Sequence, residues 1–490
     1  MTFSCYHVPS ECESLISEGS FQTLEFENHG QKIKLTVPTL TVNQLDQVIH
    51  KVKRQQRDYV RKLQTNEIIT IFDKAVQKWL DPSYEKRQQA EELLPIITGY
   101  DREMVRLFIS RYLRQFRKEN LQRMIDEDFS NPLILDEFRP RKAGGLYRAF
   151  GPNVVTHIFS GNVPALPLWS LAAGILLKSA TIGKVSSSEP LFPVLFAKTI
   201  AEIDPALGDS LAILWWKGGE SALESTSFSA SNAVIAYGGK ETIEQVRQKV
   251  PTHVTFHPHG HKVSFGLITK ECLQATKSWE TAKLAASDVS WFDQQGCLSP
   301  HVFFVERGGT YTPSDFAQML ANEMENFERT HPRASLNNSE KQAILTQRTK
   351  VEFESYESTE LQLLKSENGT AWSVVYSSLK SEKKAFPISP LNRFVTVIPI
   401  NHVSEITEYL SEVKGFVQTV GVGCSPQAFS NIINLLGDCG VNRICALGSM
   451  PHPQPGWHHD GRFHLADLVT FCDVESTLEM QMDLYDVNRD

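Results

Sequence analysis

The sequence VVTHIFSGNVPALPLWSLAAGILLKSATIGKV, residues 154–185, decides the fold. Val154–Phe159 is rich in β-branched residues, Ser160–Pro164 has the composition of a turn, and Ala165–Lys178 is a mostly apolar run of helical length. A second β-prone run, Ala180–Val185, follows directly. A strand, a helix and a second strand at this spacing predict one unit of a parallel sheet covered by helices.

The same alternation continues on the C-terminal side of this stretch. We expect a helix at Glu189–Ile203, strands at Leu211–Trp216 and Ala233–Tyr237, and a second α/β region beyond Lys262. On the N-terminal side, Val42–Glu127 places apolar residues at three- and four-residue spacing among many charges, which predicts amphipathic helices. Parallel sheets of this kind bind ligands at the C-terminal ends of their strands.

Composition and charge place the chain among ordinary globular proteins. Hydrophobic residues make up 41%, and 49 basic against 57 acidic side chains give a formal net charge of -8. The charges are interspersed, which argues against nucleic-acid binding, a function that needs clustered basic residues. The eight cysteines form no CxxC pair, no signal-peptide pattern is visible, and the longest apolar run is shorter than the ~20 residues of a membrane span. We therefore expect a cytoplasmic protein with reduced thiols and no transmembrane segment.

The first candidate for chemistry is Cys297, in the segment DQQGCLSP at 293–300. A cysteine directly after a glycine meets little crowding, and backbone N–H groups in such a turn stabilise a thiolate or an oxyanion. The alternative is that Cys297 is a small apolar core residue, the common state of cysteine. Local features alone leave both interpretations open.

The turn after the first expected strand supplies the second candidates, Ser160, Gly161 and Asn162. The Asn162 amide can donate a hydrogen bond to a developing oxyanion. The N-terminus of the helix that follows favours the phosphates of a dinucleotide. An ordinary asparagine-containing turn is the alternative interpretation.

Two further turns carry candidates for nucleotide binding. Lys184 ends the second expected strand, where a lysine can reach a ribose hydroxyl or a phosphate. Gly238 and Gly239 end a later strand and allow a pyrophosphate to approach the backbone. Because no GxGxxG follows the first strand, the usual dinucleotide fingerprint is absent. A solvated lysine and a simple glycine turn remain the alternatives.

Several separate segments, in one order along the chain, carry a resemblance to a known family. They are HIFSGNVPALPLWSL at 157–171, KVSSSEPLF at 184–192, the WKGGE run ending at Glu220, YGGKETI at 237–243, GHKVSFG at 260–266, DQQGCLSPH at 293–301 and WHHDGRFHL at 457–465. With them the chain resembles the aldehyde dehydrogenase superfamily. Within it, the chain closely resembles the LuxC-type long-chain acyl-CoA and acyl-protein thioester reductases of bacterial bioluminescence.

The resemblance implies an α/β fold of the aldehyde-dehydrogenase type. That fold has a Rossmann-type parallel-sheet cofactor domain plus an α/β catalytic domain, here with a helical N-terminal region. We expect an N-terminal region with a helical layer at 1–130, a dinucleotide-binding domain at 131–261 with part of the C-terminal tail, a catalytic domain at 262–450, and a tail at 451–490 whose candidate role is oligomerisation.

The resemblance also implies roles for single residues. Cys297 matches the superfamily nucleophile, and Asn162 matches its oxyanion-hole asparagine, although Gly161 replaces a tryptophan there. Lys184 matches the lysine that contacts the adenosine ribose. Ser187 stands where NAD-preferring relatives carry a glutamate. Since a carboxylate there would repel a 2′-phosphate, we expect NADPH as the cofactor.

Two departures from the superfamily pattern bear on the reaction. Aldehyde-oxidising relatives carry a glutamate that activates water, and the matching segment here, His257–Lys262, contains no carboxylate. An enzyme whose acyl group must pass to hydride instead of water should lack that base. A second glutamate, which in those relatives contacts the nicotinamide ribose, has no clear match near Ser389–Phe394.

The histidines allow two interpretations. Those at 257, 259 and 261 alternate, and the tract His458–Asp460 resembles metal ligands as well. Because the two tracts are far apart in the sequence and no third ligand group is evident, we expect no metal. His259 or His261 is instead a candidate acid or base for the Cys297 reaction.

Together these features imply an NADPH-dependent reductase that converts a long-chain fatty acyl thioester to the aldehyde through an acyl-Cys297 intermediate. The resemblance implies acyl-CoA or an acylated synthetase subunit as donor, aldehyde supply to a bacterial luciferase, a complex with an acyl-protein synthetase and an acyl-transferase, and a homo-oligomer. Three alternatives stay open: an acyltransferase that uses Cys297 without redox chemistry, a CoA-acylating aldehyde dehydrogenase of a non-luminous pathway, and a histidine-cluster metal protein.

Overall fold

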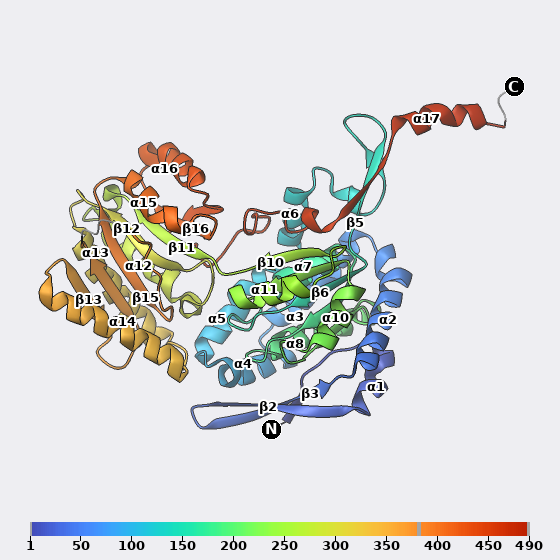
Figure 1. Ribbon diagram of the computed structural model, residues 1–490, viewed down its shortest axis with the longest axis horizontal. Helices are drawn as coiled ribbons and strands as arrows, with labels where there is room; N and C mark the ends of the chain where they lie inside the picture. Colours follow the sequence, from blue (N-terminus) through green and yellow to red (C-terminus); the bar gives the residue numbers. More distant parts are fainter. Residues whose placement is uncertain (1, 380–383, 488–490) are drawn as a thin grey trace.

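The computed structural model of the chain describes residues 2–379 and 384–487 and places two mainly parallel β-sheets side by side (Figure 1). The five-stranded sheet, drawn in green and cyan, carries the N-terminal helices. The seven-stranded sheet, drawn in yellow and orange, lies on the left of the view. Helices cover both faces of each sheet, so the α/β class predicted from the sequence is confirmed.

The five-stranded sheet is parallel throughout. In spatial order its strands are β10 (Thr255–His259), β9 (Ala233–Tyr237), β6 (Val154–Ile158), β7 (Ala180–Lys184) and β8 (Leu211–Leu214). The chain runs from β6 to β8 in one direction and then returns to place β9 on the other side of β6. The neighbours β6 and β9 therefore form a topological switch point, the place where such sheets bind ligands.

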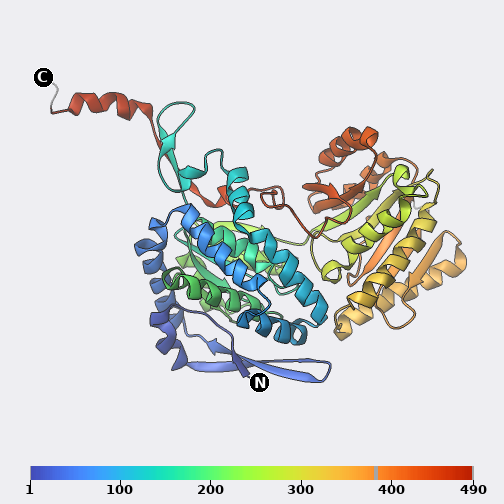
Figure 2. The ribbon, with the colours of Figure 1, turned by 180° about the vertical axis from the view of Figure 1, so that it is seen from behind.

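Helices cover both faces of this sheet (Figures 1 and 2). One face packs against α7 (Pro167–Leu176) and α8 (Leu191–Ile203), which are backed by α3 (Thr65–Leu80), α4 (Glu85–Thr98), α5 (Arg102–Tyr112) and α6 (Lys118–Asp128). The other face packs against α2 (Val42–Asp58), α10 (Ser221–Ala230) and α11 (Lys240–Lys249). Helix α7 starts two residues later than predicted, because Ala165 has a left-handed φ of 54° and Pro167 takes the first helical turn.

The first residues of the chain form strands that the sequence analysis did not predict. β1 (Thr2–Ser4), β2 (Ser20–Asn28) and β3 (Gln31–Thr39) make a separate sheet, and β2 and β3 form a long hairpin that turns at His29 and Gly30. A short helix, α1 (Glu13–Ser17), precedes β2, and the helical layer over the five-stranded sheet begins at α2, whose first turn is capped by Thr41. Polar residues alternate along β2, so the hairpin exposes one face.

The seven-stranded sheet is parallel except for one edge strand. Its order is β13 (Leu361–Lys365), β14 (Ser373–Ser377), β15 (Phe394–Ile400), β12 (Pro300–Glu306), β11 (Val263–Ile268), β16 (Val417–Gly423) and β17 (Arg443–Ala446), with β13 antiparallel to β14. Helices α12 (Ser278–Ser290) and α13 (Pro313–Thr330) cover one face, and α15 (Ile406–Leu410) and α16 (Pro426–Asp438) cover the other. Helix α14 (Asn338–Glu357) packs against the edge strand.

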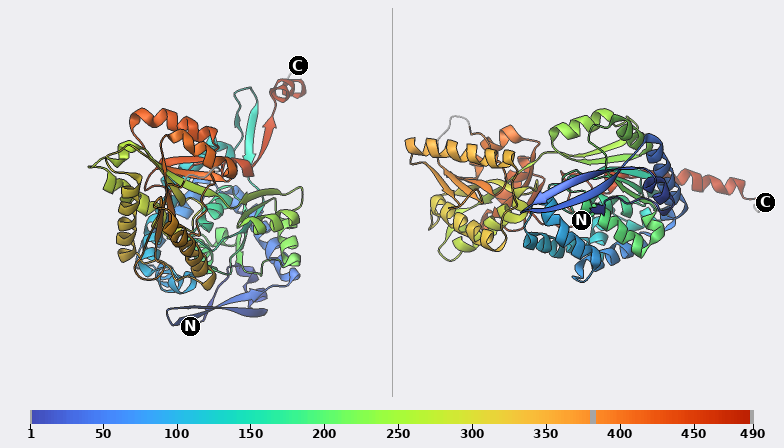
Figure 3. Two further views of the ribbon diagram at one scale, coloured as in Figure 1. Left: turned by 60° about the vertical axis from the view of Figure 1, so that its left-hand side comes forward. Right: turned by 90° about the horizontal axis from the view of Figure 1, so that it is seen from below.

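After β17 the chain returns to the five-stranded sheet. β18 (Thr470–Val474) pairs with β5 (Leu146–Phe150), which also pairs with β4 (Arg139–Pro140), and this small sheet leaves the body of the molecule. Helix α17 (Ser476–Met482) projects beyond it, as both views in Figure 3 show. Within residues 2–379 and 384–487, no helix combines the length and apolar character that crossing a membrane requires.

Candidate active site

A cavity of about 550 Å³ lies between the two sheets, at the C-terminal ends of β6, β7, β9 and β10. Its walls come from both sheets and from the segment after β17. All but one of the site residues predicted from the sequence line it: Cys297, Asn162, His259, His261, Lys184, Ser160, Gly161, Gly238 and Gly239. The exception is Ser187, whose hydroxyl accepts a hydrogen bond from the Trp215 indole at 3.1 Å.

The turn after β6 presents Asn162 to the cavity. The Asn162 Nδ2 donates to the backbone oxygen of Gln295 at 2.8 Å, and its second N–H makes no hydrogen bond with the described part of the chain, so it can donate to a ligand. The Tyr100 hydroxyl lies within hydrogen-bonding distance of the carbonyls of Asn162 (3.0 Å) and Phe292 (3.1 Å), so one phenol joins the two loops. A Cβ at Gly161 would lie 2.3 Å from the Ser188 hydroxyl, which is why this position excludes the larger residue of the superfamily.

Cys297 follows a backbone segment of unusual conformation. Phe292, Asp293 and Gln294 all have left-handed φ values, of 51°, 50° and 64°. Such a conformation costs roughly 1–2 kcal/mol for each residue other than glycine. Three in succession persist only where surrounding contacts impose them.

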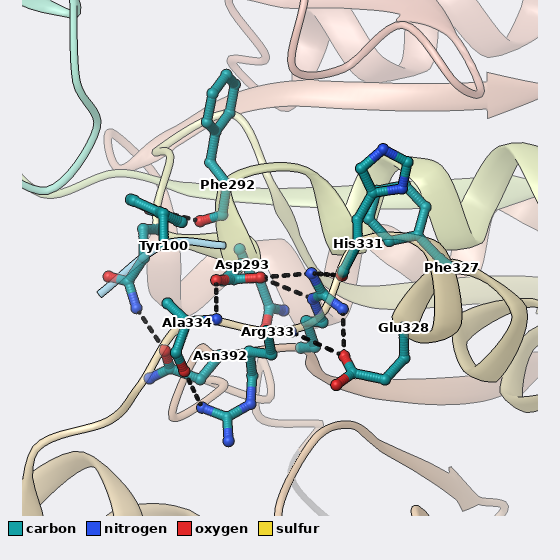
Figure 4. Close-up of polar contacts among 12 residues, drawn as sticks. Tyr100, Phe292, Asp293, Phe327, Glu328, His331, Arg333, Ala334 and Asn392 are labelled. Carbon is teal, nitrogen blue, oxygen red and sulfur yellow. Dashed lines mark hydrogen bonds and ion pairs between the residues drawn. The ribbon is translucent and has the colours of Figure 1, made fainter. Parts of the chain in front are cut away.

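A buried ion pair imposes that conformation (Figure 4). Arg393, which is 0% exposed, donates to Asp293 at 2.7 Å, to Glu328 at 2.6 Å and to the carbonyl of His331 at 2.9 Å. The second oxygen of Asp293 accepts from the backbone N–H of Ala334 at 2.9 Å. The charges of Arg393 and Asp293 are therefore satisfied by protein groups.

The segment that carries Arg393 is left-handed as well. Leu391, Asn392 and Arg393 have φ values of 64°, 58° and 64°. The Gln294 side chain accepts from the N–H of Phe394 at 2.9 Å, and the Gln295 amide donates to Asn392 at 2.9 Å. Two strained segments thus lock each other in place.

The Cys297 thiol lies at the end of this locked segment and is partly exposed to the cavity. The backbone carbonyl of Cys297 accepts a hydrogen bond from the Ser264 hydroxyl at 2.7 Å. Burial raises the pKa of the thiol to about 12, and the charge of Asp460 adds to the increase. Hydrogen bonds from the Gln418 amide and from its own backbone N–H act in the opposite direction. A thiol with this pKa is protonated near neutral pH and needs a base in order to react.

The nucleotide side of the cavity is less restrained. Lys184 makes no ion pair or hydrogen bond through its ammonium group with the residues that the structure describes, and burial lowers its pKa. Gly238 and Gly239 lead into α11, at the switch point beside the β6 turn. An unpaired lysine, a glycine turn and a helix N-terminus at a switch point fit a dinucleotide.

The two histidine tracts, which are far apart in the sequence, meet in the structure. His259 Nδ1 lies 2.9 Å from a carboxylate oxygen of Asp460, and the His259 ring stacks on His459 with centroids 4.2 Å apart. Ligand atoms of His259, His459 and Asp460 all lie within 4.8 Å of one another. His261 is exposed at the mouth of the cavity and lies 6.5 Å from the His301 ring.

These three residues do not present their ligand atoms to one point. The rings of His259 and His459 are stacked at 18°, so their in-plane lone pairs run nearly parallel instead of converging. An ion bound to one ring in its plane would lie well outside the plane of the other. A metal would require one ring to rotate out of the stack.

Two contributors to the cavity were not assigned roles from the sequence. Gln418 is a fully buried polar residue in the apolar strand β16, and such an exception within a strand is a usable signal. Asp460 belongs to the WHHDGRFHL segment and precedes a glycine in a turn, but nothing local indicates that it meets His259. The contacts Gln418–Asp460 and His259–Asp460 both join residues far apart in the chain.

Comparisons with known proteins extend over most of the chain. Residues 60–471 match the family model described as acyl-CoA reductase (LuxC). The long-chain acyl-protein thioester reductase of Aliivibrio fischeri is 27% identical over 484 residues, which cover 95% of this chain and 94% of that one. Long-chain acyl-protein thioester reductase 2 of Photobacterium leiognathi is 25% identical over 450 residues, covering 90% and 88%.

Solved structures share the fold. Aldehyde dehydrogenase 21 from Physcomitrella patens has a TM-score of 0.74 at 12% identity, covering 97% of this chain and 98% of that one. An NADP-dependent glyceraldehyde-3-phosphate dehydrogenase from Bacillus halodurans, complexed with NADP, has a TM-score of 0.68 at 13% identity, covering 93% and 96%. These likenesses confirm the aldehyde-dehydrogenase-like fold. Because the family model spans most of its length, the chain belongs to the LuxC family of acyl-CoA reductases.

Proposed function

We propose that this protein reduces a long-chain fatty acyl thioester to the aldehyde, with NADPH, through an acyl-Cys297 thioester. One observation carries the proposal. Among the described residues that line the cavity, Asp460 is the one carboxylate, and its two oxygens are occupied by His259 and by the Gln418 amide at 2.7 Å. The cavity therefore holds a thiol and a glycine turn suited to a nucleotide, and its lining offers no unpaired carboxylate that could activate water.

The acyl chain has a matching environment. Aromatic and aliphatic side chains line the same cavity as the thiol: Val163, Leu166, Trp169, Phe292, Leu298 and Trp457. Contact with such residues stabilises a hydrocarbon chain by about 25 cal/mol for each Å² removed from water. A long acyl group is therefore favoured over a short one.

Asn162 and the backbone of Cys297 stabilise the charge that develops during acyl transfer. When the Cys297 sulfur attacks the thioester carbonyl, the free N–H of Asn162 and the Cys297 N–H donate to the oxyanion. His259 or His261 moves the protons of the thiol and of the leaving group. The nicotinamide nucleotide, when bound, supplies the hydride that reduces the acyl carbon.

The choice of nucleotide follows from the end of β7. Lys184 would hold the adenosine ribose or its phosphate, and Ser160, Gly161, Gly238 and Gly239 would lie beside the pyrophosphate. Ser187 offers no negative charge to repel a 2′-phosphate, so NADPH is preferred over NADH.

The biological context follows the relatives in the family. We infer that the donor is acyl-CoA or an acylated synthetase subunit, in a cytoplasmic complex with an acyl-protein synthetase and an acyl-transferase. The aldehyde then serves a luciferase, or a non-luminous pathway that uses a CoA-acylating enzyme of this type. The projecting segment around β18 and α17 is the candidate contact of a homo-oligomer.

The test is nicotinamide oxidation by the purified protein with tetradecanoyl-CoA, measured with NADPH and with NADH. We expect NADPH oxidation with an equal amount of aldehyde, and loss of both in Cys297→Ala. Cys297→Ser should prevent thioester formation while preserving the fold. Acylation of Cys297 without nucleotide oxidation would instead favour an acyltransferase.

A further inference from the structure

The segment after β17 adds a carboxylate to the active site. His459 and Arg462 pair across a two-residue turn in which Asp460 has a φ of 55° and Gly461 a φ of 75°. Two successive left-handed residues of type Asp-Gly define a tight hairpin turn. This turn directs Asp460 toward the C-terminal end of β10, where His259 lies.

Asp460 fixes the chemical state of His259. The carboxylate lies 2.9 Å from Nδ1, and an ionised carboxylate can only accept, so Nδ1 carries the proton. Nε2 then has the lone pair, and it makes no hydrogen bond with the residues that the structure describes. The His259 ring also stacks on Tyr237 (4.5 Å) and on His459 (4.2 Å), and these contacts restrict its rotation.

The carboxylate stays ionised. Burial alone would raise the pKa of Asp460, but the hydrogen bond from His259 and the positive charge of Lys262 hold that pKa well below its usual range. Gln418, which is 0% exposed, donates to the other oxygen of Asp460 and also contacts the Cys297 thiol. One amide therefore joins the carboxylate to the nucleophile.

The geometry points to His259 as the acid and base of acyl transfer and to Asp460 as its positioning residue. His259 Nε2 takes the proton of the Cys297 thiol as sulfur bonds to the acyl carbon. The bond from that carbon to the donor sulfur then breaks, and His259 returns the proton to the departing thiolate. The products are the acyl-Cys297 thioester and a free thiol, and no electrons are exchanged.

Asp460 makes this transfer possible in two ways. It holds the tautomer whose Nε2 is basic, and it stabilises the imidazolium that forms between the two proton transfers. The inference rests on the proposed function, because it concerns the first half of that reaction. It also gives the turn at 459–462 a catalytic task, separate from the oligomerisation expected for the tail.

Formation of acyl-Cys297 without nucleotide, followed by mass spectrometry, tests the inference. We compare Asp460→Asn and His259→Gln with His253→Gln, an exposed histidine outside the cavity. With tetradecanoyl-CoA we expect a loss of about 1000-fold for the first two and none for the third. The thiol of an S-(4-nitrophenyl) thioester departs without a proton. With this donor, the loss of acylation rate in Asp460→Asn and His259→Gln should be at least about tenfold smaller than with tetradecanoyl-CoA.

The two donors separate a proton-transfer role from damage to the fold. Equal losses with both donors, or a loss confined to His261→Gln, would overturn the assignment. So would a stoichiometric metal that is present in the purified protein and absent from Asp460→Asn. If the wild type and Cys297→Ser are equally free of acyl group, the proposed function itself fails. If the wild type is acylated and Asp460→Asn is equally fast, only the present inference fails.

Discussion

The two sides of the cavity are built by different means. On the nucleotide side, the turns after β6, β7 and β9 offer small residues and a lysine without an ion pair to the described residues. On the thiol side, two strained segments are held by the buried Asp293–Arg393 pair and by amide hydrogen bonds. We infer that a bound nucleotide supplies the partners of Lys184 and of the glycine turn on the first side, whereas contacts within the fold fix the nucleophile on the second.

The largest effect concerns the thiol. Since burial raises the pKa of Cys297 to about 12, the thiolate fraction should increase about tenfold per pH unit between about pH 7 and about pH 10. We expect the rate of iodoacetamide alkylation at Cys297 to rise about 1000-fold over that range. Peptide mass spectrometry gives the rate, with the exposed Cys472 as internal reference. A rate already constant at neutral pH would contradict the buried environment.

The next effect separates the two sides by stability. Arg393→Met leaves Asp293 buried without its partner, so the free energy of unfolding should fall by about 3–5 kcal/mol. Lys184→Met removes a half-buried charge that has no ion pair with any described residue, and the same free energy should stay constant or increase slightly. Urea unfolding followed by tryptophan fluorescence measures both.

A double variant sharpens this result. Asp293→Asn combined with Arg393→Met removes both charges, and it should be more stable than Arg393→Met alone. If the single variants at 393 and 184 lose equal stability, the proposed contrast between the two sides is wrong.

Asn162 belongs to both sides, because it comes from the five-stranded sheet and bonds to the thiol loop. Asn162→Ala removes one oxyanion donor, and kcat with tetradecanoyl-CoA should fall about 100-fold, equivalent to about 3 kcal/mol. The dissociation constant of NADPH should change little. Stopped-flow measurement of acylation and fluorescence titration of NADPH separate the two quantities. If only the affinity for NADPH changes, Asn162 serves nucleotide binding and not the stabilisation of the oxyanion.

The same contrast explains how much could be predicted from the sequence. Strands β6, β7 and β9 were predicted because their apolar runs and turns are local signals, and the resemblance assigned Asn162, Lys184 and Cys297. The pair Asp293–Arg393 spans 100 residues and His259–Asp460 spans 201. No local pattern encodes such contacts, since they depend on how the two sheets and the returning chain pack together.

The N-terminal hairpin was missed for a different reason. Helical spacing from Val42 onward predicted the helices, whereas the alternation of polar residues along β2 and β3, the pattern of a half-exposed strand, was not interpreted as strand. The late start of α7 depends on one residue, Ala165, whose left-handed backbone is imposed by the cavity turn. Boundaries next to the site were therefore less predictable than the elements themselves.

The smallest expected effect concerns the nucleotide side of the cavity. Ser187→Glu places a carboxylate at the end of β7, so the NADPH dissociation constant should increase about tenfold while that of NADH decreases. Ser187→Ala is the matched control, because it removes the hydroxyl that accepts from Trp215 without adding charge. Fluorescence titration with both nucleotides gives the constants. Equal weakening of both nucleotides in both variants would limit Ser187 to holding Trp215.

Ser187→Glu should also leave the stability of the fold unchanged. Ser187 is exposed and lies outside the cavity wall, so a longer side chain meets solvent rather than packed neighbours. Its unfolding midpoint should match the wild type, in contrast to Arg393→Met. On the nucleotide side the bound ligand supplies contacts that the fold does not need, so a substitution there can change nucleotide preference without changing stability. On the thiol side the same residues that place the nucleophile also hold the fold, so no comparable change there should leave stability untouched.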